Sequence, residues 1–439
     1  MSIPFVLTGI TVVTGDAIGT VHENWTVGVN AAGLIDYAGP SAQAEIPPGS
    51  LRIDGTGKYL TPGLINAHAH LFADGKPLPR IYTHPRAARS LTWFMHTQAG
   101  RMLLRKRAKD NAITQLHTGV TTLRTVGDVA YEVIATRDAI ERAEYLGPRI
   151  LPSGPLMAIT GGHGAPQIAL ICDDPQQARA NTRTNIRHGA NTIKISATGG
   201  VTDATKIGYA GKPEMPEASM RAICEEAHNA GVLVAAHAQS PEGLRAALRA
   251  GADTIEHGSS MNDEIVDLFK NNPASLRGTS SLIPTLQVCL PLVKLDPAVT
   301  GADDVIRANA ELVLTEMLSG IRSAIEHGIT IGVGNDSAIS YVTHANFWRE
   351  LDLLQRYAGV DAATLLHAAT QVNATILGLD TVTGSIEPGK TADLVMLGAN
   401  PLESFRHLAA PQMVVVRGER ITEPEITRIP AIDAQLDTL

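Results

Sequence analysis

Residues 60–71 read LTPGLINAHAHL, a turn at Thr61-Pro62-Gly63 followed by a short apolar run that ends in His68 and His70. Such a run is typical of a buried strand that is entered through a turn. Residues i and i+2 of a strand point to the same face, so the two imidazoles are expected close together at the strand's end. Two imidazoles on one face can hold a metal ion, but a His-x-His pair also occurs by chance on protein surfaces. The pair identifies a metal site only if further ligands lie at the ends of later strands.

The composition is that of a folded chain. Its 439 residues are enough for two or three domains, or for one large barrel with a smaller domain. Apolar residues make up 44% and charged residues 18%, which is below the roughly 25% that is typical of soluble domains and argues against disorder. The net charge is −8 and no basic stripe follows the chain, so nucleic acid is not an expected partner.

The cysteines and the N-terminus indicate the compartment. Cys172, Cys224 and Cys289 are far apart without a CxxC pair, a pattern typical of reduced, buried thiols in a cytosolic protein. The start MSIPFVLTGITVV lacks the basic region and cleavage site of a signal peptide, and no apolar run is long enough to cross a membrane. We expect a cytoplasmic homo-oligomer that acts on a small molecule and has no membrane partner.

Both ends of the chain carry β patterns. Residues 4–58 contain short apolar or alternating runs that are separated by Gly-Pro-Ser and Pro-Pro-Gly turns. The segment GSIEPGKTADLVM at residues 384–396 has a similar turn followed by an apolar run. We therefore predict one small β-sandwich domain that is built from residues 1–59 and 385–439.

Between these ends, short apolar strands alternate with amphipathic helices, which predicts a parallel sheet. Eight such units over about 300 residues predict a closed (β/α)8 TIM barrel spanning residues 60–384. A doubly wound open sheet is the alternative, but eight roughly even units favour closure. Residues 71–108 and 287–302 are expected to be long loops over the active face. The strand candidates are Leu64–His68, Thr121–Val126, Arg149–Ser153, Thr192–Ser196, Val232–His237, Thr254–His257, Leu282–Leu286 and Thr330–Gly334.

Metal-binding residue types recur at the ends of these strands, where the catalytic groups of a (β/α)8 barrel lie. Imidazole and carboxylate are suitable ligands for zinc, and a catalytic zinc site keeps one position open for water. Each residue alone is more often an ordinary hydrogen-bonded core residue, so the argument depends on their coincidence at one mouth. The candidates are His68, His70, Lys194, His237, His257 and Asp336.

Lys194 is unexpected in such a group, because an ammonium has no lone pair and repels a metal ion. Burial beside a metal lowers the pKa of a lysine, and the neutral amine can then take up carbon dioxide as a carbamate. That anion has two oxygens and can bridge two metal ions. A carbamate on Nζ would therefore account for Lys194 among ligands that suit Zn²⁺, with Mn²⁺ or Co²⁺ as alternatives.

Two loops contribute further candidates. His163 lies in TGGHG at residues 160–164, after the third strand, and glycines let a backbone approach a ligand closely. A flexible turn with an incidental histidine explains the same pattern equally well. Gly199-Gly200 follow the fourth strand, and Tyr209 is placed downstream of them where it can reach the mouth.

With these residues in place, the chain resembles the amidohydrolase superfamily over nearly its whole length. The motifs that carry the resemblance are PGLINAHAH, IKISATGGV, AAHAQ, IEHG, GND and GSIEPGKTADLV. TGGHG followed by IKISATGGV is similar to the imidazolonepropionase-like and prolidase-like branch, which acts on dipeptides and N-acyl amino acids. Imidazolonepropionases lack the bridging lysine, so Lys194 argues against that activity.

The resemblance implies a binuclear metal centre. His68, His70 and Asp336 would hold the first ion, and His237 and His257 would hold the second. The carboxylated lysine would bridge the two ions together with a hydroxide that acts as the nucleophile.

The resemblance also implies roles in catalysis. Asp336 would take the proton of the nucleophile and deliver it to the leaving group. The second metal, together with His163, would polarise the scissile carbonyl and stabilise the oxyanion. His163 and Tyr209 would contact the substrate.

The leading functional prediction is therefore an amidohydrolase that cleaves a C–N bond in a dipeptide or an N-acyl amino acid. A lactonase, a carbamate hydrolase or a phosphotriester hydrolase with the same metal pair is the alternative among enzymes. A scaffold that has lost its metal site is a third possibility, which the intact ligand set opposes. The residues that choose among substrates are expected in the segments 71–108, 158–174, 199–215 and 287–302.

Overall fold

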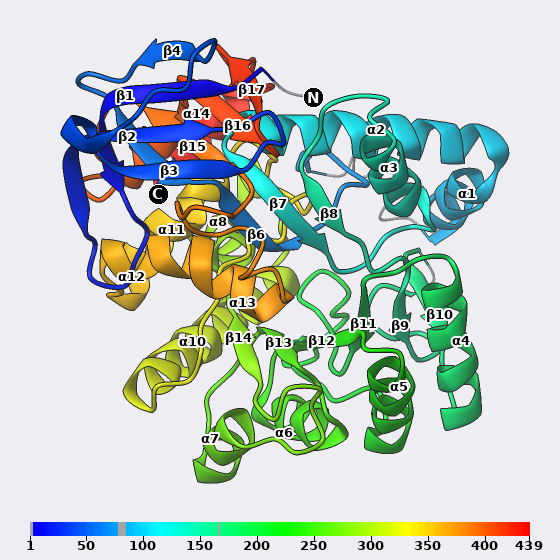
Figure 1. Cartoon of the computed structure of the whole chain (residues 1–439). Coiled ribbons are helices and arrows are strands. Elements are labelled where there is room, and N and C mark those ends of the chain that lie inside the picture. The colour runs from blue at the N-terminus through cyan, green and yellow to red at the C-terminus, as the bar shows by residue number, and fades with distance from the viewer. Residues whose placement is uncertain (1–2, 78–84, 166) are drawn as a thin grey trace.

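The computed structural model describes residues 3–77, 85–165 and 167–439. Residues 78–84 of the predicted loop 71–108 lie outside this description, as does residue 166. Figure 1 shows the N-terminal strands in blue beside the C-terminal strands in red, with the parallel strands and most helices on the other side of the molecule.

The two ends of the chain join in one mixed eight-stranded sheet. Its strands are β1 (Phe5–Val13), β2 (Val21–Val29), β3 (Ile35–Pro40), β4 (Leu51–Asp54), β5 (Tyr59–Pro62), β15 (Leu394–Leu397), β16 (Met413–Val416) and β17 (Glu419–Thr422). Strand β5 links the two ends, because it pairs parallel to β1 and antiparallel to β15. Phe5 and Leu7 are fully buried against Leu394 and Val415 in the core of this part. The predicted union of both chain ends is confirmed.

The middle of the chain forms parallel ladders. A three-stranded sheet has the order β6-β7-β8, and a six-stranded sheet has the order β10-β9-β11-β12-β13-β14. The strands are β6 (Leu64–Ala69), β7 (Val120–Thr125), β8 (Arg149–Leu151), β9 (Leu156–Ala158), β10 (Ala169–Ile171), β11 (Thr192–Ser196), β12 (Leu233–Ala238), β13 (Thr254–His257) and β14 (Ser281–Ile283).

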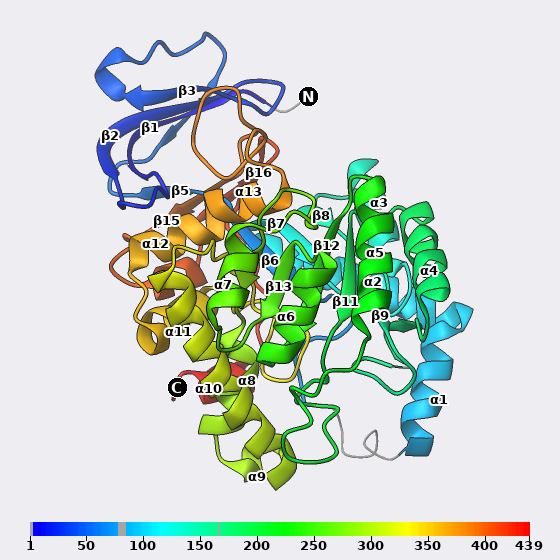
Figure 2. The same cartoon turned by 90° about the horizontal axis from the view of Figure 1, so that it is seen from below.

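Helices follow most of these strands, as the alternating pattern predicts. They are α1 (Pro85–His96), α2 (Gln98–His117), α3 (Glu132–Glu141), α4 (Pro175–Arg187), α5 (Glu217–Asn229), α6 (Pro241–Ala250), α7 (Asp263–Lys270), α8 (Leu286–Lys294), α9 (Pro297–Thr300), α10 (Asp304–Glu326), α11 (Phe347–Leu353), α12 (Ala362–His367), α13 (Asn373–Leu377) and α14 (Pro430–Leu436). Helices α5, α6 and α7 lie along the outer side of β11–β13 (Figure 2). The architecture is therefore α/β.

The predicted eighth strand, Thr330–Gly334, does not form a regular strand. Isolated parallel bridges join residue 331 to β14 and residue 337 to β6. A side chain replaces only part of the strand pairing here: the N–H of Val333 donates to Oδ1 of Asn373 at 3.0 Å, and the carbonyl of Val333 accepts from Nδ2 of Asn373 at 2.8 Å as well as from the N–H of Ala67 at 3.0 Å. Hydrogen bonding still continues from β14 through this segment to β6.

The predicted loop 287–302 is instead largely helical, in α8 and α9. Glu350 accepts the backbone N–H groups of Leu286 at 2.6 Å and Gln287 at 2.8 Å. These groups have no partner within their own helix, so the distant carboxyl group of Glu350 stabilises the start of α8. Residues 71–108 were also expected to form a loop, but α1 and the first half of α2 occupy much of this segment.

Cys172, Cys224 and Cys289 are buried free thiols, as predicted. Within the described ranges, no helix combines the length and apolar character that a membrane span requires.

Candidate active site

His68 and His70 lie buried at the end of β6, and Nδ1 of each imidazole has a hydrogen-bond partner. Nδ1 of His68 is 2.6 Å from Oε2 of Glu256, and Nδ1 of His70 is 2.6 Å from the carbonyl oxygen of Gly127. A carbonyl oxygen only accepts, so Nδ1 of His70 carries a proton and Nε2 keeps its lone pair. The Nε2 atoms of His68 and His70 lie 3.3 and 3.0 Å from Oδ1 of Asp336.

Asp336 reaches these rings through a left-handed backbone turn with φ 58°. Its backbone N–H donates to the carbonyl of His68 at 2.9 Å. Burial raises the pKa of Asp336, but the neighbouring His68 and His70 lower it more, so this pKa lies well below its ordinary value. Oδ1 is buried and has no hydrogen-bond partner among the described residues, because its short contacts to the rings lack hydrogen-bond geometry. A charged oxygen that faces imidazole lone pairs fits a cation bound between them.

His257 completes this group from the end of β13. Its φ of 70° breaks the alternation of the strand, and its Nδ1 contacts Oγ1 of Thr285 at 2.7 Å. One ligand atom each from His68, His257 and Asp336 lies within 4.8 Å of the others, and all three residues are buried. Donors that share a zinc ion at about 2.0–2.2 Å are themselves about 3–3.6 Å apart, so the short contacts at Asp336 fit shared coordination.

Lys194 on β11 and His237 on β12 face the same space. Nζ of Lys194 is buried without a hydrogen-bond partner in the described part of the chain. Burial lowers the pKa of Lys194 to about 8, although Glu256 and Asp336 raise it. Burial also holds the pKa of His237 well below its ordinary value, and its ring centroid is 4.6 Å from that of His257. Lys194 therefore has a buried amine that lies beside imidazoles and has no hydrogen-bond partner among the described residues.

One cavity of about 570 Å³ brings all six predicted ligands together. Its described lining contains Lys194 and no other lysine or arginine, and beyond the ligands it combines apolar side chains with the carboxylates of Asp203 and Asp303. The apolar side chains that line it are Phe72, Val126, Leu156, Ile168, Val201, Ala204, Val288, Ile306 and Ile339.

His163 lines this cavity as well, and two acids hold it in place. Its ring stacks on that of His237 with centroids 4.2 Å apart. Nδ1 of His163 contacts Oδ2 of Asp203, and its backbone N–H donates to Oε2 of Glu214 at 2.8 Å. Burial lowers the pKa of His163, but Asp203 raises it more, so this pKa lies above its ordinary value. The sequence predicted His163 but neither acid, since both belong to a loop whose path no local pattern gives.

Tyr209 stands apart from the cavity. Its side chain is 38% exposed, and its ring lies 5.2 Å from the ammonium of Lys212. It is absent from the described cavity lining, and a contact with substrate stays a prediction.

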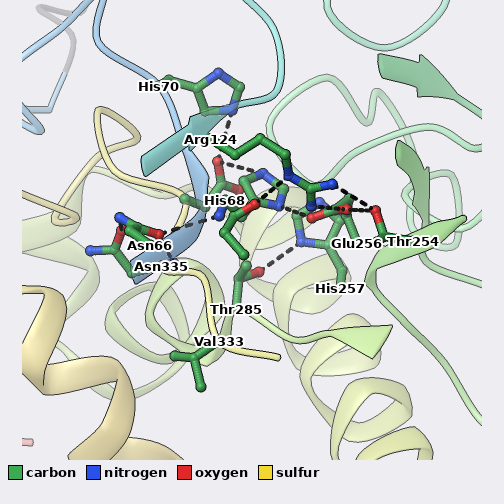
Figure 3. A network of polar contacts seen from close by, with 12 residues as sticks. Asn66, His68, His70, Arg124, Thr254, Glu256, His257, Thr285, Val333 and Asn335 are labelled. Atoms are coloured by element: carbon green, nitrogen blue, oxygen red, sulfur yellow. Dashed lines mark hydrogen bonds and ion pairs between the residues drawn. The ribbon is translucent and has the colours of Figure 1, made fainter. Parts of the chain in front are cut away.

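A buried ion pair behind His68 was not foreseen. Arg124 on β7 and Glu256 on β13 are both 0% exposed, and Nη2 of Arg124 lies 2.8 Å from Oε1 of Glu256 (Figure 3). The available signals were a charged residue inside the apolar strand TTLRTV and the glutamate of IEHG. Neither pattern gives the partner, because the two strands are remote in sequence.

Comparison with known proteins places this fold and site in a family. The sequence model of the amidohydrolase family matches residues 59–421. The chain therefore belongs to the amidohydrolase family, and it is a hydrolase.

Two solved structures and one further relative are similar to this chain over most of its length. The crystal structure of a candidate prolidase from Bifidobacterium longum has 48% sequence identity and a TM-score of 0.88, over 100% of this chain and 99% of that chain. A prolidase complexed with N-methylphosphonate-L-proline has 27% identity and a TM-score of 0.79, over 96% of this chain and 100% of that one. The ochratoxinase of Aspergillus niger is 25% identical over 87% of this chain and 79% of its own length.

Proposed function

We propose that this amidohydrolase uses two divalent metal ions to cleave the C–N bond of a dipeptide or an N-acyl amino acid. The observation that carries the proposal is the buried Nζ of Lys194, which has no hydrogen-bond partner among the described residues and lies beside the imidazoles and Asp336 in one cavity. One similar structure is named a prolidase and another a candidate prolidase, and these names support dipeptides as the first substrates to test.

The residues present fit two ions with N and O ligands. His68, His70 and Asp336 would hold one ion and His237 and His257 the other, with carboxylated Lys194 between them. When bound, such ions lower the pKa of water toward neutrality and polarise a carbonyl oxygen. Zinc is the ion proposed first, with manganese and cobalt as alternatives.

The chain's own groups then supply the proton transfers. Asp336 is charged and its Oδ1 is unpartnered, so it is suited to accept a proton and to return it to the leaving nitrogen. Against the effect of burial, the charged Asp203 raises the pKa of His163, and the protonated ring donates from Nδ1 to Asp203 and from Nε2 to the substrate carbonyl.

We also propose that the two parallel sheets form one (β/α)8 barrel spanning residues 60–384. The hydrogen bonds that run from β14 through residues 330–336 to β6 support this closure. The separate apolar core of the mixed sheet supports a second domain made of residues 1–59 and 385–439.

The function is tested by a hydrolysis screen on zinc-loaded protein. The substrates are a library of dipeptides, including those that end in proline, and a library of N-acyl amino acids, with detection of the released amine. Lys194→Ala should lose most activity because it removes the bridge. Lys270→Ala, at an exposed position on α7, is the matched control and should keep full activity.

Amine release that depends on Lys194 would support the proposal, and the preferred side chain would define the substrate class. Full turnover and two bound ions in Lys194→Ala would contradict the binuclear centre. If neither library is hydrolysed although two ions are bound per chain, lactones, carbamates or phosphotriesters would be favoured as substrates instead.

A further inference from the structure

The side chain of Glu256 receives hydrogen bonds on both of its oxygens. Oε1 accepts from Nη2 of Arg124 at 2.8 Å and from Oγ1 of Thr254 at 2.6 Å. Oε2 is 2.6 Å from Nδ1 of His68. Figure 3 shows Arg124, Thr254 and Glu256 beside the ring of His68, and Glu256 contacts Nδ1 of that ring whereas Asp336 contacts Nε2. The carboxylate therefore has one defined orientation.

Arg124 ties the same group to the backbone of β6. Its Nε donates to the carbonyl of Ala67, next to His68, at 2.7 Å, and its Nη1 donates to Oγ1 of Thr254 at 3.0 Å. The guanidinium thus joins β6, β7 and β13 under the imidazole. A planar group with several fixed donors holds such a geometry better than a flexible ammonium.

Stability alone is a weak explanation for this pair. Removing two charges from water costs about as much as their attraction returns, and an apolar replacement of such a pair is often neutral or stabilising. The hydrogen bonds here instead determine which nitrogen of His68 carries the ring proton. A carboxylate acceptor at Nδ1 places the proton of His68 on Nδ1 and leaves the lone pair on Nε2, which faces Asp336.

We propose that Arg124 and Glu256 are positioning residues that fix the Nδ1–H tautomer and the ring orientation of His68, so that its Nε2 is presented to a metal ion. The inference rests on the proposed metal site and assigns a purpose to two buried charges that the reaction itself does not use. Thr254 is the third member of this group.

The hydrogen-bond pattern makes Glu256→Gln a sharp test. Arg124 and Thr254 both donate to the Oε1 position, so the amide must place its oxygen there and turn its NH₂ group toward His68. An NH₂ group donates, so it forces Nδ1 of His68 to accept and moves the ring proton to Nε2. A ring with a protonated Nε2 cannot bind a metal through that atom. The change is nearly isosteric and nevertheless inverts the tautomer.

The first measurement is zinc affinity, by competition with a chelator, on purified full-length protein. Loss of a partner of this kind typically weakens metal binding about 10–100-fold, and we expect this loss in Glu256→Gln. The matched control is Asp393→Asn, which breaks the ion pair of a fully buried carboxylate with Arg149, 3.0 Å away in the wild type, outside the cavity. The control should keep wild-type zinc affinity. Unchanged zinc affinity in Glu256→Gln, or an equal loss in the control, would overturn the inference.

The second measurement is the tautomer of His68, from ¹⁵N chemical shifts of the metal-free protein with His68→Gln for assignment. The wild type should show Nδ1–H, and Glu256→Gln should show Nε2–H. An Nε2–H tautomer in the wild type would overturn the inference even if the glutamine variant does not fold. A wild type that shows Nδ1–H but binds no metal would contradict the proposed function and leave the positioning geometry supported.

Discussion

Gly200 lies directly against the imidazole of His163: a Cβ atom added at position 200 would come within 2.4 Å of Nδ1 of that ring. The ring is fixed on its other sides by His237 and Asp203, so it cannot retreat without losing one of these contacts. Overpacking of this kind costs about 1–3 kcal/mol. We expect Gly200→Ala to lower turnover roughly tenfold while zinc binding persists. Gly398→Ala is the control, because the added methyl group meets only the flexible end of Gln412. An equal loss of turnover in both variants would contradict a role of the His163 ring in turnover.

Removal of the imidazole itself should affect turnover more strongly than metal content. His163→Ala is expected to lower kcat roughly 10²–10³-fold, as loss of one oxyanion donor typically does. Zinc stoichiometry should stay at the wild-type value, and so should the activity of His327→Ala, whose histidine is exposed at the end of α10. Loss of zinc from His163→Ala would make this residue a metal ligand instead.

Asp203→Asn should cause a smaller loss than removal of the ring. A hydrogen bond to a charged partner contributes about 1.5–3 kcal/mol, so kcat should fall roughly 10–100-fold. The ring remains in place and only its charged partner is removed. The comparison of kcat with KM checks the role, because a positioning acid lowers kcat more than it changes KM.

Asp336→Asn separates metal binding from proton transfer. The amide oxygen keeps one neutral ligand atom, so part of the bound zinc should remain. An amide cannot accept and return the proton, so turnover should fall roughly 10²–10⁴-fold. Zinc content and single-turnover rates should be measured beside Asp380→Asn, at an exposed position after α13. Unchanged turnover in Asp336→Asn would remove the proposed role.

Local sequence patterns predict well which side chains of this site lie together at the ends of the strands. Alternation gives the inward face of each strand, and the carboxyl ends of parallel strands meet at one edge. For that reason His68, Lys194, His237 and His257 could be brought together from their positions alone, and the cavity contains all four. Asp336 follows the same rule although its segment lacks regular strand pairing.

Contacts made by side chains across long stretches of sequence were not predictable. The start of α8 depends on Glu350, which lies more than sixty residues further along the chain, so the segment gave no local helix signal. Asp203 meets His163 only because two loops fold over the same mouth. Arg124 and Glu256 carry charges in apolar strands, and pairing them requires the three-dimensional order of β6, β7 and β13.

Glu350 should give the metal-free protein a distinct pH dependence of stability. Burial raises the pKa of Glu350 from 4.5 to about 8, although the N–H groups of Gln287 and Leu286 lower it. The folded state then binds more protons than the unfolded state between these values, so the stabilisation is complete below pH 4.5 and declines as the pH rises to about 8.

Glu350→Gln removes this titration, so the difference in Tm between wild type and variant should change over that pH range and be constant above it. Glu326→Gln, at an exposed position at the end of α10, is the control and should follow the wild type. Parallel curves for wild type and Glu350→Gln would show that Glu350 titrates normally.

Carboxylation of Lys194 can be observed without any substrate. Burial lowers the pKa of Lys194 to about 8, so near neutral pH a larger fraction of its amine is neutral than for an ordinary lysine. Only the neutral amine attacks carbon dioxide, and divalent ions would stabilise the resulting anion. Zinc-loaded protein in ¹³C-bicarbonate should therefore show one carbamate signal by ¹³C NMR, absent from Lys194→Ala and retained in Lys270→Ala. A wild-type protein that binds two zinc ions without this signal would exclude the carbamate bridge and require another ligand between the ions.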